Sequence, residues 1–147
     1  MLYLKQDFSN VVLMSLLDRT TNSITGTINW SYLFSFKNDM TKESFTMINY
    51  LGGDMSTIDG SNNLIVKIKD IQTGFFSPLK GEIKLYPKGF WSYDVYEQKS
   101  LTNLDITDTS IIAKIETGKA YIYDNTEEVK YTEHTDTTDT TNYMYIK

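Results

Sequence analysis

Apolar and polar residues alternate along much of the chain, and they do so far more often than apolar residues recur every three or four positions. A period of two is typical of strands that have one buried and one solvated face, and Thr, Tyr, Ile, Val and Phe suit such strands. The clearest cases are 32–37 and 64–69. The residues expected to face a core from these segments are Tyr32, Phe34, Phe36, Leu64, Val66 and Ile68. The sequence therefore predicts an all-β protein.

Further strand-like segments follow one another with turn-forming residues between them. They are 2–5, 10–17, 44–49, 82–86, 90–97, 110–116, 119–124 and 143–146. The turn signals are Asn38-Asp39, Gly52-Gly53-Asp54, the run 59–62, Pro87-Lys88-Gly89 and Asn125. Strands that recur about every ten residues, with turns between them, favour two packed sheets over a fold with helices. We expect a single antiparallel β-sandwich.

The segment 85–95 suggests a particular topology for this sandwich. Trp91, Tyr93 and Val95 share one face of a strand that begins directly after a turn. This is similar to the late, core-forming strand of immunoglobulin-like domains, without their cysteine. An immunoglobulin-like topology and a different β-sandwich topology both remain open, and in either case we expect these three residues to be buried.

The last residues differ in character from the rest of the chain. From Tyr131 to Asn142 the sequence is a polar run rich in Thr and Asp, which cannot supply a buried face. Strand-forming residues return at the end, as Tyr143, Met144, Tyr145 and Ile146. We therefore expect a β-sandwich domain over 1–130 and a flexible arm over 131–147, whose four apolar residues bind a partner. The terminal strand either joins the edge of a neighbouring subunit or folds back onto its own sheet, and the sequence leaves both open.

Composition and charge exclude several classes of protein. The 147 residues leave no room for two full domains, and 40% hydrophobic residues are enough for a core. There is no cysteine, which excludes disulfides and thiol nucleophiles, and His134 is the only histidine. A net charge of −5 has the wrong sign for holding phosphate backbones, and no apolar run is long enough to span a membrane as a helix. We expect neither nucleic acid nor a membrane as a partner.

Few residues are candidates for catalysis. Glu82, Asp94 and Glu97 could supply the carboxylate pair of a glycosidase, although solvent-facing strand positions are ordinarily charged. Asp136 and Asp139 lack the glycine and the bidentate glutamate of an EF-hand. His134 beside Glu133 has no second candidate ligand nearby in the sequence. We predict no enzyme, and no catalytic, cofactor-binding or metal-binding residue.

The tryptophans suggest one alternative function. Trp30 and Trp91, together with the many tyrosines, could form the flat platform on which a sugar ring stacks in a carbohydrate-binding module. The competing interpretation, which we favour, is that Trp91 belongs to the core and that Trp30 opens a core strand. The two interpretations differ in whether the rings are exposed and coplanar.

Several strand motifs together resemble a known group of proteins. These are Leu2-Tyr3-Leu4-Lys5 leading into 10–13, then Tyr32-Leu33-Phe34-Ser35-Phe36-Lys37-Asn38-Asp39, then 89–98, closed by 116–122. The pattern resembles small virion proteins of tailed phages of Bacteroidetes, including crAss-like phages. It covers roughly the first 125 residues and consists of strand patterns, not catalytic signatures. Trp91 departs from it, because tyrosine is more usual there, and the Thr/Asp-rich tail is not part of it.

The resemblance implies a function without catalysis. It implies an immunoglobulin-like or related β-sandwich, located in the virion, that serves as an accessory head, collar or tail component. The implied partners are other virion structural proteins, in a homo-oligomer or a multicopy assembly, with no cofactor. The alternative function is a carbohydrate-binding module for host-surface glycans. The virion layer, the copy number and the neighbouring protein do not follow from the sequence.

Overall fold

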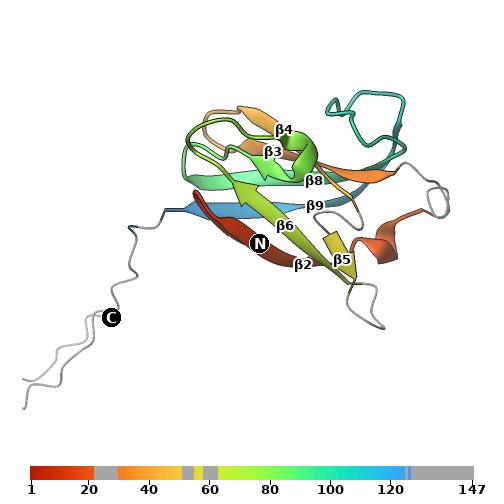
Figure 1. Ribbon diagram of the computed structural model, residues 1–147, viewed down its shortest axis with the longest axis horizontal. Coiled ribbons are helices and arrows are strands. Elements are labelled where there is room, and N and C mark those ends of the chain that lie inside the picture. The colour runs from red at the N-terminus through yellow and green to blue at the C-terminus, as the bar shows by residue number, and fades with distance from the viewer. Residues whose placement is uncertain (22–29, 51–54, 58–62, 125, 127–147) are drawn as a thin grey trace, which may run out of the picture.

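Strands make up nearly all of the regular structure, and the only helices in the described residues are two short 3-10 turns (Figure 1). The computed structural model describes residues 1–21, 30–50, 55–57, 63–124 and 126. The elements are β1 (Leu2–Lys5), β2 (Ser9–Met14), η1 (Leu17–Arg19), β3 (Ser31–Asn38), β4 (Ser44–Asn49), β5 (Met55–Thr57), β6 (Leu64–Asp70), η2 (Pro78–Lys80), β7 (Glu82–Ile83), β8 (Gly89–Gln98) and β9 (Ile111–Tyr123). The predicted all-β class is confirmed.

Two sheets pack face to face. The larger sheet has the strand order β1-β9-β8-β3-β4, and the smaller sheet has the order β2-β6-β5, with β7 beside β6. In Figure 1 the strands β2, β6 and β5 cross in front of the larger sheet. An immunoglobulin sandwich places strands B, E and D in one sheet and G, F and C in the other, to which variable-type domains add C′. In chain order, β2, β3, β4, β5, β6, β8 and β9 correspond to strands B, C, C′, D, E, F and G. The two sheets then have the orders B-E-D and G-F-C-C′, as in the immunoglobulin sandwich.

The sandwich is not antiparallel throughout. β1 runs parallel to β9, with Leu2 opposite Ala120 and Lys5 opposite Tyr123. The short strand β7 runs parallel to β6. The first strand therefore joins the larger sheet, although the strand that follows it in the chain, β2, belongs to the smaller one. All other strand pairs are antiparallel.

The core lies between the sheets and contains the residues that alternation predicted. Trp91 and Val95 are fully buried, and Tyr93 is 6% exposed. The residues that pack with them in one cluster include Phe34, Phe36, Val66 and Ile68. Phe34 and Phe36 stack at 6.5 Å between ring centroids, and Phe45 tilts against Trp91 at 6.2 Å. The predicted burial of the face formed by Trp91, Tyr93 and Val95 is confirmed.

The predicted solvated face of β3 is wrong in its first half. Leu33 was expected on the wetter face, yet it is fully buried, as are Tyr32 and Phe34 on either side of it. The reason is the segment between β8 and β9, which folds back towards the outer face of the larger sheet. Its Leu104 carbonyl accepts a hydrogen bond from Thr46 Oγ1 on β4 at 3.0 Å. Both faces of β3 are therefore covered there.

Other strand boundaries also differ from those predicted. The segments 110–116 and 119–124 form one strand, β9, which continues through Gly118 opposite Tyr93. The segment 10–17 ends as a strand at Met14, because the chain then turns into η1. The segment 82–86 is a strand only over Glu82–Ile83. β5 was not predicted. The boundary at residue 130, the arm 131–147 and the predicted strand 143–146 lie outside the described residues.

Candidate functional site

The three candidate carboxylates do not form a catalytic pair, because each lies in a different setting. Glu82 belongs to the smaller sheet, where Lys69 Nζ lies 3.0 Å from its Oε1. The Ser77 backbone N–H donates to the same side chain at 2.8 Å. This hydrogen bond, with the help of Lys69, holds the pKa of Glu82 below its usual value. A carboxylate kept ionised in this way is suited to an ion pair and poorly suited to acting as a general acid.

Asp94 and Glu97 both lie on β8 but point to opposite faces of the sheet, being three residues apart. Asp94 faces Lys114, with 3.6 Å between Oδ1 and Nζ. Glu97 is fully buried. Its two carboxylate oxygens accept hydrogen bonds from the Thr21 backbone N–H at 2.9 Å and from Thr21 Oγ1 at 2.6 Å. Glu97 thus holds the segment after η1 against β8, which is a structural role.

The two tryptophans do not form an exposed platform. Trp91 is fully buried, and its indole N–H donates to the Pro87 carbonyl at 3.0 Å. Trp30 is half-buried and packs edge-on against Tyr32, with the ring planes at 85° and the centroids 5.4 Å apart. The interpretation of Trp91 as a core residue is confirmed, whereas Trp30, expected to open a core strand, lies one residue before β3 begins at Ser31.

Several predicted candidates lie outside the described residues. They are Glu133, His134, Asp136, Asp139 and the four apolar residues of the arm, Tyr143, Met144, Tyr145 and Ile146. Within the described ranges, no group of three or more His, Asp or Glu side chains is placed to hold a metal ion. The short helices in the same ranges are not long or apolar enough to cross a membrane.

An exposed aromatic patch lies on the outer face of the larger sheet, where three neighbouring strands align one residue each. Tyr3 on β1 is opposite Tyr121 on β9, and Tyr121 is in turn opposite Phe90 on β8. Tyr3 and Met1 are each 65% exposed, and Phe90 is 53% exposed. These four residues line an open hollow of about 350 Å³. We call this set, Met1, Tyr3, Phe90 and Tyr121, the aromatic patch.

The rings of the aromatic patch are tilted against one another. Tyr3 meets Tyr121 edge-on, at 63° between planes and 6.4 Å between centroids. Phe90 and Tyr121 lie 5.0 Å apart at 57°. Edge-to-face and tilted contacts of this kind are favourable between aromatic rings. The Tyr121 ring is therefore coplanar with neither Tyr3 nor Phe90, so the patch presents a corrugated apolar surface.

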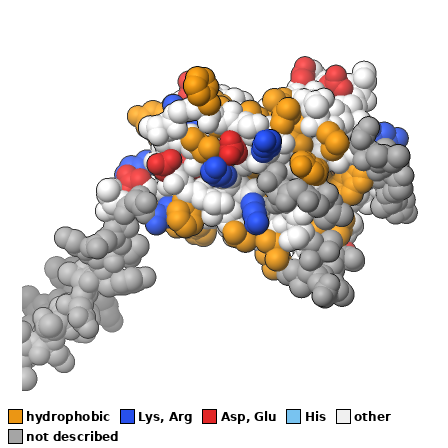
Figure 2. All heavy atoms as spheres, viewed as in Figure 1, with side chains coloured by type: hydrophobic (Ala, Val, Ile, Leu, Met, Phe, Trp, Pro, Cys, Tyr) orange, Lys and Arg blue, Asp and Glu red, His pale blue; other side chains and the backbone are white. Residues whose placement is uncertain are grey.

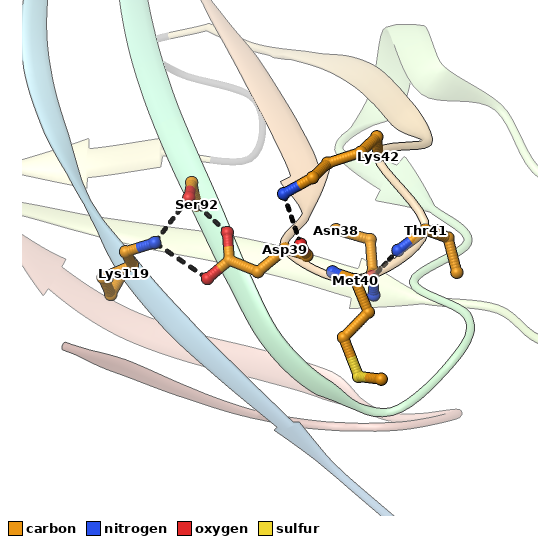
Figure 3. A network of polar contacts seen from close by, with 7 residues as sticks. All are labelled: Asn38, Asp39, Met40, Thr41, Lys42, Ser92 and Lys119. Atoms are coloured by element: carbon orange, nitrogen blue, oxygen red, sulfur yellow. Dashed lines mark hydrogen bonds and ion pairs between the residues drawn. The ribbon is translucent and has the colours of Figure 1, made fainter.

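A polar network lies beside the patch and joins three strands to the β3–β4 turn (Figure 3). Lys119 Nζ on β9 lies 2.8 Å from Asp39 Oδ2, and Ser92 Oγ on β8 donates to Asp39 Oδ1 at 2.6 Å. Both hydrogen bonds lower the pKa of Asp39, and the one from Lys119 has the larger effect. Asn38 shapes the turn itself, because its Oδ1 accepts the backbone N–H groups of Met40 and Thr41, each at 2.8 Å.

A second hollow, of about 630 Å³, lies under the segment between β8 and β9. Its lining residues are Ser35, Ser44, Thr46, Thr102, Asn103, Leu104, Asp105 and Ile106. Asn103 fixes this segment by donating to Gln98 Oε1 at 2.9 Å. None of the residues that line this hollow is aromatic, so it lacks the ring faces on which sugars stack.

Charged side chains on one face of the molecule do not segregate into one region (Figure 2). On the face seen in Figure 2, hydrophobic side chains gather in several places, with lysines and acidic residues between them. Ion pairs on the surface, such as Lys88 with Asp124 at 3.1 Å, balance part of the charge locally. On this face, the described residues form no continuous basic track for a nucleic acid.

Sequence reasoning did not find the aromatic patch. Tyr3, Phe90 and Tyr121 each directly neighbour a buried residue in their strands, so alternation marked them only as outward-facing. Large aromatic residues on the wetter face of three strands were the available signal. Their adjacency depends on β1 lying beside β9, which the local pattern does not contain.

The sequence matches no protein-family model and no curated protein. Among solved structures, similarity is found to a protein from Bacteroides vulgatus ATCC 8482 described as a "putative glycoside hydrolase". The two are 9% identical with a TM-score of 0.42, over 86% of this chain. The chain spans 17% of the length of that protein. A likeness of this size carries no conclusion about fold or function.

Proposed function

We propose that the chain is a non-enzymatic structural protein of a phage virion, an accessory head, collar or tail component. It would act through protein–protein contacts in a repetitive assembly, where many weak contacts add up. The location in the virion is supported by the strand motifs that resemble phage virion proteins. The contact role is supported by the aromatic patch, whose exposed rings form an apolar surface suited to a protein partner.

The geometry of the aromatic patch also bears on the alternative of a carbohydrate-binding module. A sugar ring stacks on flat, coplanar aromatic faces. The half-buried Tyr121 ring lies at 63° to Tyr3 and at 57° to Phe90, and Trp91 is buried. Among the described residues these observations favour a protein partner over a glycan. We therefore keep glycan binding as the outcome that would displace the proposal.

The first test is the composition of purified particles. Mass spectrometry of gradient-purified virions of the encoding phage should find the chain at many copies per particle, and immunogold labelling should assign it to one layer. Absence from particles, with the chain present in the infected-cell lysate, would refute the virion role. Binding of the purified chain to host-surface glycans on an array would support the alternative instead.

The second test concerns the aromatic patch itself. Tyr121→Ser, in a tagged chain expressed during infection, should reduce recovery with particles at least tenfold, because it removes the ring shared by both aromatic contacts. Phe75→Ser is the matched control, since Phe75 is fully exposed and lies outside the patch. Thermal unfolding of both variants establishes that they are folded. Equal recovery of both would show that the patch is not the contact surface.

A further inference from the structure

Among the described residues, β2 is an edge strand, with one side that pairs with no other strand. The Asp70 backbone N–H donates to the Phe8 carbonyl at 3.0 Å, so Phe8 and Asp70 form a hydrogen-bonded pair. This pair determines which residues of β2 form hydrogen bonds with β6. In an antiparallel pair, alternate residues direct their N–H and C=O groups towards the partner strand. Asn10 and Val12 therefore face β6, while Val11 and Leu13 direct their backbone groups away from it.

In the described part of the chain, no strand pairs with this side of β2. Constant-type immunoglobulin domains have strand A next to strand B on this side. Here the first strand, β1, pairs with β9 in the other sheet. The position beside β2 is therefore vacant among the described residues.

In the described part of the chain, both edges of the larger sheet have backbone groups that are occupied. At the edge of β1, the Asn10 side chain accepts the Lys5 backbone N–H at 2.7 Å and donates to the Lys5 carbonyl at 3.0 Å. At the edge of β4, the Ile48 carbonyl accepts the Gly81 backbone N–H at 3.0 Å. Side chains and loops that occupy edge groups in this way prevent the addition of another strand.

The side chains around the vacant position are apolar. Val11 and Leu13 are 64% and 59% exposed on the outer face of β2. Val12 on β2 and Leu2 on β1 are only partly buried against the core. An open strand edge with exposed apolar residues is the kind of site at which an extended segment adds to a sheet.

We propose that this position accepts the terminal segment Tyr143–Ile146 of a second copy of the chain. As an added strand, the segment would place Tyr143 and Tyr145 on one face and Met144 and Ile146 on the other. One pair would cover Val11 and Leu13, and the other would close the open side of the core. The backbone of the segment would pair with the free groups of Val11 and Leu13.

The length of the intervening chain favours a second copy over the same chain. β9 ends at Tyr123, opposite Lys5, and the chain itself passes from Lys5 to Ser9 on β2 in three intervening residues. A segment of the same chain would thus need only a short connection. Sixteen residues, 127–142, precede Tyr143. A random coil of that length spans on average about 20–24 Å. This is about twice the ~10 Å between packed sheets, and it is a distance suited to a link between two molecules.

Charge supports the same assignment. The sequence 127–142 contains five acidic residues, Glu127, Glu128, Glu133, Asp136 and Asp139, against one lysine, Lys130. Lys67 on β6 lies directly opposite Val11 and is exposed. An acidic segment that leads into the site would be attracted to this lysine, and the attraction would weaken as salt is added.

The test uses the full chain in three forms. The acceptor variant is Leu13→Lys, the donor variant is Tyr143→Asp with Tyr145→Asp, and the control is Phe75→Lys, which makes the same kind of change on an exposed loop residue. Sedimentation should show concentration-dependent association of the wild type and of the control. Each of the other variants alone should associate at least tenfold more weakly. An equimolar mixture of the two should form a heterodimer, since one supplies an intact segment and the other an intact edge.

Each other result would overturn the proposal. A monomeric wild type at all concentrations would refute association between copies, including the case in which the segment binds its own β2. Association that persists in the donor variant would indicate direct β2–β2 pairing. A mixture that fails to associate, with both variants folded by thermal unfolding, would exclude exchange of the segment. None of these measurements depends on the virion role, so the two proposals can fail separately.

Discussion

The ring of Tyr93 lies directly over the backbone of its cross-strand partner, Gly118. A Cβ atom on residue 118 would come within 2.7 Å of Tyr93 Oη and within 2.8 Å of two ring carbons. Such distances are shorter than carbon atoms tolerate, so the position excludes any side chain while Tyr93 keeps its place. Glycine at position 118 therefore leaves the space that the Tyr93 ring occupies.

The first prediction concerns this contact. Gly118→Ala should lower the free energy of unfolding by roughly 1–3 kcal/mol, because the extra carbon displaces a packed ring. In a Tyr93→Leu background, the same substitution should cost at least about 1 kcal/mol less. Urea unfolding of the four proteins gives the coupling. Equal costs in both backgrounds would mean that the Tyr93 ring is not what restricts residue 118.

A second prediction concerns the buried indole. Trp91→Ala should destabilise the fold by about 3–5 kcal/mol, the usual cost of removing a large buried aromatic side chain. It also leaves the Pro87 carbonyl without its donor. Phe75→Ala should change stability by less than about 0.5 kcal/mol, since that ring is fully exposed. Denaturant unfolding checks both, and a stable Trp91→Ala protein would contradict the core assignment.

The third prediction concerns acid. The pKa of Asp39 is lower in the folded protein than in the unfolded chain, so the unfolded state binds more protons between these two values. The stability from Asp39 is present above its usual pKa, near 4, and is lost as pH falls through the folded value. Lys119→Met should raise the pKa of Asp39 in an NMR titration, because it removes the ion pair with Asp39. The control Lys84→Met leaves that ion pair intact and should leave the pKa of Asp39 unchanged. No difference between the two would disprove the role of Lys119.

A fourth prediction concerns the arm. Deletion of 131–147 should leave the β-sandwich folded, with circular dichroism and thermal midpoint close to those of the full chain at low concentration. The reason is that the described residues by themselves form both sheets and one contiguous core cluster. If the deletion instead unfolds the monomer, the terminal strand belongs to its own sheet. A control deletion of Lys147 alone should have no effect.

The strands themselves were largely predictable from the sequence. Alternation over 32–37 and 64–69 gave the face of Phe34, Phe36, Val66 and Ile68 that is buried, because side chains point to alternate sides in any strand. The turn at Asn38 was also predictable, since its side chain bonds to the backbone that follows it. These features depend on neighbours in the chain.

What the tertiary structure alone decided depends on residues distant in the sequence. The pairing of β1 with β9 brings Tyr3 and Tyr121 together and, among the described strands, leaves one side of β2 without a partner. The segment that contains Leu104 covers the outer face of β3, and so Leu33 is buried in spite of its place in the pattern. Alternation in a strand reports which residues share a face. Which strand or loop then lies beside that face is set by packing between segments up to about a hundred residues apart, and no local pattern carries that information.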